Sequence, residues 1–105
     1  MGKVIDISAR LNNEKPKLKL GEGKEYTVND RKSTMLILNQ KMKDSDLNDV
    51  EEIDKILEVL LGKEAVAEIN EMDPSFADYQ TIFMATIASA MGEDLEEVEE
   101  RFRQP

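Results

Sequence analysis

The chain has 105 residues, a common size for one domain and enough to bury a modest hydrophobic core. It contains no cysteine and no histidine, so its composition excludes disulfides, the usual zinc sites and hydrolases that rely on a serine–histidine or cysteine–histidine pair. The net charge is −9 but is uneven, because residues 1–43 carry +5 and residues 44–105 carry −14.

The first thirty residues predict an arm followed by a β-hairpin. Residues 1–14 are assigned to the arm, within which residues 4–7 form either a third short strand or an ordered tail. Residues 15–30 hold two stretches of alternating polar and apolar residues, separated by Gly21-Glu22-Gly23, which favours a tight turn. The hairpin is expected to place four apolar side chains on one face: Leu18, Leu20, Tyr26 and Val28.

Residues 31–103 predict a series of short helices. The first ends near Lys43, the second ends at Gly62, the third covers residues 63–72, and the fourth ends at Gly92. Their expected inward faces include Leu38 in the first helix, and Val66, Ile69 and Met72 in the third. The predicted N-caps are Asn29 or Asp30, then Ser45 or Asp46, then Asp73 followed by Pro74, and finally Asp94.

The fourth predicted helix has the broadest apolar face. At 100° per residue, one side gathers five residues: Phe76, Tyr79, Phe83, Ile87 and Ala90. Ile82 and Met84 widen the apolar arc to about 200°, whereas an ordinary surface helix needs only about 100°. Either this helix is buried among several others, or one edge stays exposed to bind a partner. For the second alternative, the candidate partner-binding residues are Ile82, Met84, Ile87 and Met91.

Together these elements predict a mainly α (α+β) fold. A single domain over residues 1–105 would consist of an N-terminal β-hairpin followed by a compact bundle of four to five short helices. No window approaches the roughly 20 apolar residues of a membrane span, and the first residues lack the apolar run of a secretory signal. We therefore expect a cytoplasmic protein that does not bind a membrane.

One segment partly matches two known sites. Asp44, Asp46 and Asn48 occupy the first, third and fifth positions of a calcium loop, but Asp49 and Lys55 replace its required glycine and bidentate glutamate. The same segment resembles the attachment site of acyl carrier proteins, except that Asp46 separates Ser45 from Leu47. Helix capping accounts for these residues, so we expect no catalytic residue, cofactor or metal.

Several short sequence segments and the order of the predicted elements resemble those of a known family. The relevant segments are Lys24-Glu25-Tyr26-Thr27-Val28-Asn29-Asp30, Leu60-Leu61-Gly62-Lys63-Glu64-Ala65, Asp73-Pro74-Ser75-Phe76-Ala77-Asp78-Tyr79, and a helix closed by Met91-Gly92 before an acidic tail. Over most of residues 15–103 this arrangement is similar to the small tail assembly chaperones encoded by long-tailed bacteriophages and prophages.

The resemblance implies a non-enzymatic role in virion assembly. Such chaperones bind the long, aggregation-prone tape measure protein, keep it soluble and hand it to the tail tube protein in the cytoplasm of the bacterial host. A protein with this role needs an apolar contact surface and enough net charge to stay in solution.

A second hypothesis follows from charge alone. The segment Glu93 to Glu100 holds six acids in eight residues, which is compatible with a small acidic inhibitor or nucleic-acid mimic that binds a basic protein. The lysines near the hairpin do not predict nucleic-acid binding, because the whole chain is strongly acidic. The basic and acidic parts could instead meet between copies in a salt-sensitive homo-oligomer.

Overall fold

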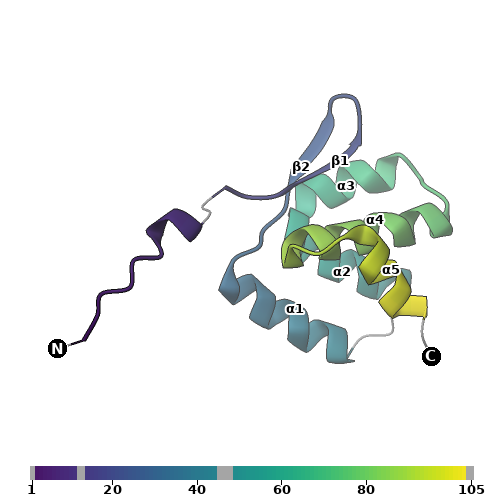
Figure 1. The fold of residues 1–105 in the computed structure, drawn as a ribbon. Helices are drawn as coiled ribbons and strands as arrows, with labels where there is room; N and C mark the ends of the chain where they lie inside the picture. The colour runs from purple at the N-terminus through teal and green to yellow at the C-terminus, as the bar shows by residue number, and fades with distance from the viewer. Residues whose placement is uncertain (1, 12–13, 45–48, 104–105) are drawn as a thin grey trace.

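The computed structural model describes residues 2–11, 14–44 and 49–103, and it confirms the predicted fold class (Figure 1). In this part of the chain a two-stranded antiparallel hairpin precedes five α-helices. The helices gather into one body beneath the hairpin, and the N-terminal arm runs outward from it. The molecule therefore measures 59 Å along its longest axis and only 23 Å along its shortest.

The arm, residues 2–11, is exposed throughout. Its one regular feature is a 3₁₀ turn, Ser8–Arg10, where the carboxylate of Asp6 accepts hydrogen bonds from the Ser8 backbone N–H (3.0 Å) and hydroxyl (2.7 Å). The alternative of a third strand at residues 4–7 is wrong. A strand needs a neighbour for its backbone hydrogen bonds, and the strands in the described chain pair only with each other.

The hairpin consists of β1 (Lys17–Gly21) and β2 (Lys24–Thr27), with Leu18 opposite Tyr26. Leu18 and Val28 are buried while Leu20 and Tyr26 are half-buried, so the four predicted apolar side chains do face the body. A backbone hydrogen bond from the Asn29 N–H to the Leu60 carbonyl (2.8 Å) joins the end of the hairpin to the second helix.

Three helices follow the hairpin: α1 (Lys32–Asp44), α2 (Val50–Leu61) and α3 (Lys63–Glu71). Gly62 separates α2 from α3 with φ 93°, a backbone angle at which side chains with a Cβ are strained. Asp49 caps α2 by accepting from the Glu51 N–H (2.9 Å). This helix therefore begins later than predicted, and the proposed caps Ser45 and Asp46 lie outside the described residues.

The helix α4 (Phe76–Met91) is the centre of the bundle, since it packs against α5, α2 and β1. Its N-cap is Ser75, whose hydroxyl accepts from the Asp78 N–H (3.1 Å), and not Asp73 as predicted. Serine is among the best N-caps, and here Asp73 has φ 48° in the turn before it. The predicted end at Gly92 is confirmed, with the glycine in the left-handed conformation.

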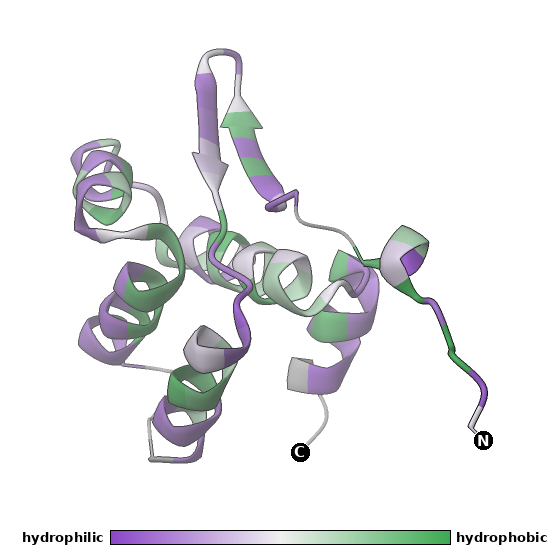
Figure 2. Ribbon diagram, turned by 90° about the vertical axis from the view of Figure 1, so that its left-hand side faces the viewer, coloured by the Kyte–Doolittle hydropathy of each residue, from purple (hydrophilic) through white to green (hydrophobic). Residues whose placement is uncertain are grey.

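The last helix, α5 (Leu95–Arg103), turns back along α4. A backbone hydrogen bond from Glu93 N–H to the Ala88 carbonyl (2.9 Å) closes the turn, and the fully buried Val98 anchors the helix. Figure 2 shows the hydrophobic faces of the helices turned toward the middle of the body. Two residues expected on inward faces are instead exposed, because they lie at helix ends: Met72 (38%) and Phe76 (44%).

Candidate partner-binding groove

A groove is lined by residues of α1, α4 and α5, and α4 supplies Ile87 and Met91 to it. Met84, Ile87 and Met91 recur every three or four residues, so they form one strip along α4. Ile87 is 1% exposed and packs in the core, Met84 is half-buried against that core, and Met91 is 47% exposed at the end of the helix. The strip thus rises from the core to the surface toward the C-terminus of α4.

The helix α1 forms the second wall. Asn39, Met42 and Lys43 line the groove, and the half-buried Met42 packs against the core cluster. Leu36 lies one turn before Asn39 on the same strip of α1 and is 61% exposed, so it extends the apolar surface beyond the groove. The hollow itself has a volume of about 340 Å³.

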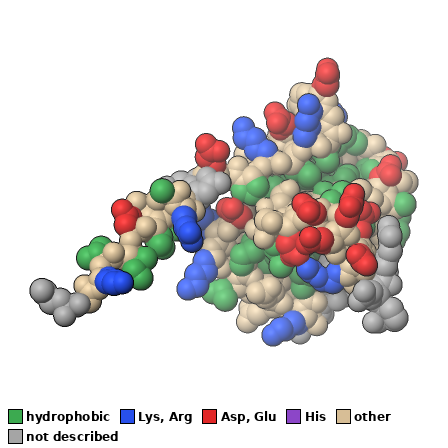
Figure 3. Space-filling model, in the orientation of Figure 1, with side chains coloured by type: hydrophobic (Ala, Val, Ile, Leu, Met, Phe, Trp, Pro, Cys, Tyr) green, Lys and Arg blue, Asp and Glu red, His purple; other side chains and the backbone are tan. Residues whose placement is uncertain are grey.

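The rim of the groove is polar. Arg101 on α5 lines it and makes a two-pronged ion pair with Glu93, which raises the pKa of the Arg101 guanidinium above its usual value and keeps it cationic. Lys43 supplies a second cation from α1. The outer face of α5 is acidic, and Figure 3 shows acidic side chains gathered there beside apolar surface. An apolar floor with a charged rim suits binding of an apolar segment from water.

The four residues predicted to contact a partner do not share one surface. Ile82 and Met91 are nine residues apart, which at 100° per residue places them on opposite sides of α4. Ile82 is half-buried away from the groove, so it does not belong to this surface. Ile87 is almost fully buried and lines the groove only as part of its floor, so its contact with a partner stays a prediction. Met84 and Met91 remain candidates.

The sequence prediction of partner-binding residues included none from α1, although α1 lines the groove. The signal for it is the run Met35-Leu36-Ile37-Leu38, since four consecutive apolar residues point around more than half of a helix and cannot all face inward. Only Leu38 is fully buried, whereas Leu36 and Ile37 are exposed at 61% and 47%. Such a run in a surface helix indicates either a second contact face or a binding surface.

Two other polar contacts tie elements of the fold together. The Tyr79 hydroxyl donates to Asp54, joining α4 to α2, and burial together with this hydrogen bond raises the pKa of Tyr79 well above its usual value. The Tyr26 hydroxyl donates to Glu68 (3.0 Å), joining the hairpin to α3, and partial burial raises the pKa of Tyr26 as well. Both tyrosines therefore act as structural links in their neutral form.

Metal-ligand clusters and membrane-spanning helices are both absent from the described residues. No group of three or more acidic, histidine or cysteine side chains in that part lies close enough to hold a metal ion. No described helix is long and apolar enough to cross a membrane. The calcium-like and carrier-like motifs depend on Ser45, Asp46 and Asn48, which lie outside the described residues.

Comparison with known proteins found no match to this chain. No protein-family model matches the chain, and neither the curated proteins nor the solved structures contain a match. The assignment of function therefore depends on the groove, the charge distribution and the local sequence resemblance.

Proposed function

We propose that this protein is a non-enzymatic phage tail assembly chaperone, which binds the tape measure protein in the bacterial cytoplasm and keeps it soluble until it meets the tail tube protein. The observation that carries the proposal is the groove between α1, α4 and α5, where Met42 and Met91 flank the floor formed by Ile87. Unbranched methionine side chains adapt to varied apolar partners, as a protein that holds an unfolded chain requires.

The charge of the molecule supports the same role. A complex that covers an aggregation-prone chain must remain soluble, and a net charge of −9 provides repulsion between complexes. The acidic face of α5 lies beside the groove and would stay in solvent while an apolar segment occupies the floor.

Co-expression with the tape measure protein from the same gene cluster tests the proposal. We expect the wild-type chain to bring the tape measure protein into the soluble fraction, and Met91→Asp to abolish this effect by placing a charge in the groove. Met72→Asp is the matched control, because Met72 is similarly exposed (38% against 47%) but lies at the end of α3, outside the groove. A tape measure protein that is equally insoluble with and without the wild-type chain would refute the proposal.

The alternative is an acidic inhibitor or nucleic-acid mimic of a basic protein, and the acidic face of α5 is the observation that favours it. The two functions respond in opposite ways to the same changes. Binding through α5 would weaken steeply with salt and survive Met91→Asp, whereas binding through the groove would tolerate salt and be lost in that variant.

A further inference from the structure

The N-terminal arm presents an apolar surface that its own chain leaves in solvent. Four large aliphatic side chains within eight residues are mostly exposed: Val4 (93%), Ile5 (81%), Leu11 (63%) and Ile7 (50%). Single exposed aliphatic residues are ordinary, but a cluster of this density in a short segment is typical of a docking element. Figure 2 shows these hydrophobic segments on the arm, separate from the body.

The arm also has a defined local shape. Asp6 holds the start of the 3₁₀ turn through Ser8, and the Arg10 N–H donates to the Ile7 carbonyl (2.8 Å). Residues 2–7 are thus an extended segment that ends in a hydrogen-bonded turn. A segment with this local order loses less conformational entropy on docking than a featureless tail.

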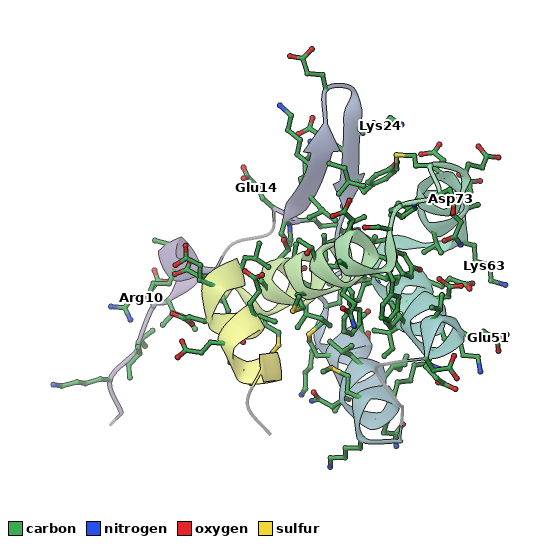
Figure 4. All side chains as sticks on the ribbon, turned by 90° about the vertical axis from the view of Figure 1, so that its right-hand side faces the viewer. Arg10, Glu14, Lys24, Glu51, Lys63 and Asp73 are labelled. Atoms are coloured by element: carbon green, nitrogen blue, oxygen red, sulfur yellow. The ribbon has the colours of Figure 1, made fainter. Side chains whose placement is uncertain are left out.

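The root of the arm lies beside the groove. Glu14, Lys15 and Pro16 line a hollow together with the last turn of α4, and Met91 lines both this hollow and the groove. Figure 4 shows Glu14 near the end of α4, with Arg10 further out on the arm. Two molecules that meet at this region would each bring an arm to the other's groove.

Charges on the arm complement those near the groove. Residues 2–11 of the arm carry two cations, Lys3 and Arg10, against one acid, Asp6, whereas α5 carries a row of glutamates in Glu96, Glu97, Glu99 and Glu100. On the other wall, Lys43 adds a cation to the lining of the groove, and Asp6 is the acid that lies between Ile5 and Ile7 on the arm. An arm in the groove would thus bury its aliphatic side chains against Met42, Ile87 and Met91 and set its cations against α5.

We propose that the groove is occupied by the arm of a second copy of this chain, so that two copies exchange arms. A second copy fits the geometry, because the arm runs outward from its own body (Figure 1) and leaves its apolar side chains in solvent. The exchange is reciprocal and closed, as expected for a two-fold dimer. A standard interface buries roughly 1,600 Å², so each of the two arms and two grooves would have to bury about 400 Å². This pairing forms without a client protein, and the client of the proposed function would take the groove in place of the arm.

The mass of the full chain in solution and its dependence on the arm test the proposal. We expect a dimer by sedimentation equilibrium, and we expect Ile5→Asp combined with Ile7→Asp to raise its dissociation constant at least about 100-fold, or about tenfold for each of the two arms. Both side chains lie outside the core, so the variant should fold normally. Val50→Asp is the matched control, because it introduces the same charge at an exposed aliphatic residue (45%) at the start of α2 that does not line the groove.

Site-directed cross-linking locates the contact, since the natural chain has no cysteine. A mixture of Ile5→Cys chains and Met91→Cys chains should form mixed dimers with a short bismaleimide, whereas replacing the second partner with Lys63→Cys should not. Figure 4 shows Lys63 on the opposite side of the molecule from the arm.

Several results would overturn the proposal. These are a monomeric wild-type chain at the highest soluble concentration, a dimer that survives the double aspartate change, or a dimer lost equally in the Val50→Asp control. In a chain that carries both cysteines, cross-linking only within one molecule would show that the arm folds onto its own groove. Failure of tape measure binding would affect none of these readouts, so the two proposals can fail separately.

Discussion

At the scale of single residues, the turn between α3 and α4 shows how one hydroxyl sets the start of a helix. An acid followed by proline, as in Asp73-Pro74, is typical of a helix start, yet the Ser75 hydroxyl accepts the hydrogen bond from the Asp78 N–H. Asp73 is held at φ 48°, where a residue with a Cβ is strained, and it makes no cap for α4. Which of several adjacent cap-forming residues is used depends on the path of the preceding turn.

This assignment gives a direct prediction for stability. Ser75→Ala should lower the free energy of unfolding by about 1 kcal/mol, because it removes the acceptor for an N–H in the first turn of α4. Asp73→Gly should be neutral or slightly stabilising, because glycine adopts positive φ without strain. Urea denaturation of both variants measures the difference. A larger loss in Asp73→Gly than in Ser75→Ala would restore the aspartate as the cap.

The buried hydroxyl of Tyr79 predicts a pH dependence. Its folded-state pKa lies above the unfolded value of about 10, so the stability supplied by its neutral form is fully present below pH 10 and falls as the pH rises through the folded pKa. The wild-type free energy of unfolding should therefore decline above about pH 10, by up to about 1.4 kcal/mol per pH unit from this group. Denaturation between neutral pH and pH 11 measures the decline.

Tyr79→Phe separates this effect from the titration of lysines. The variant should be less stable than the wild type at neutral pH, because Asp54 loses its donor, but its stability should decline less above pH 10. Tyr26→Phe is the control, since Tyr26 is only half-buried. Parallel pH profiles for wild type and Tyr79→Phe would contradict the raised pKa.

At the scale of elements, the strip along α4 passes from core to surface within two turns. Ile87 is sealed in the core, and Met91, four residues later, has nearly half of its surface in solvent. The change occurs because Gly92 ends the helix and the chain leaves toward α5, so fewer elements cover the last turn of α4. The same strip can therefore contribute to stability at one end and to binding at the other.

Two alanine variants distinguish these roles. Ile87→Ala should lower the free energy of unfolding by about 2–5 kcal/mol, because it leaves a cavity in the core. Met91→Ala should change stability by no more than about 0.5 kcal/mol, as expected for a surface position, while weakening binding of the partner. Thermal unfolding and co-expression measure the two effects. Equal losses of stability would mean that Met91 is part of the core.

At the scale of the whole molecule, net charge acts against compactness. The chain carries −9, and the glutamates of α5 gather on one face (Figure 3). Repulsion among like charges on the surface is weakened by salt, over a Debye length of about 8 Å at physiological ionic strength. We therefore expect the unfolding midpoint to rise with added sodium chloride. A midpoint that falls would indicate that attractive ion pairs dominate.

Much of this fold could be predicted from local patterns. The alternation in the hairpin places Leu18 and Val28 on the buried face, and the glycines at 62 and 92 end their helices as expected. These features depend on side-chain period and on backbone angles that glycine adopts without strain, both of which are properties of neighbouring residues.

Whether each apolar side chain is exposed depends on tertiary packing and not on the local sequence pattern. Residues 82–91 of α4 carry the same broad apolar arc whether it is covered or not, and only the packing of α2, α5 and the hairpin buries Ile87 while leaving Met91 in solvent. Likewise, Val4, Ile5 and Ile7 are β-branched and favour a strand, but no strand of the described chain lies beside them. The spacing of apolar residues thus determined the secondary structure elements, and the composition determined the net charge. The location of the groove depended on how distant segments pack, because burial is a property of all the elements that meet at a surface.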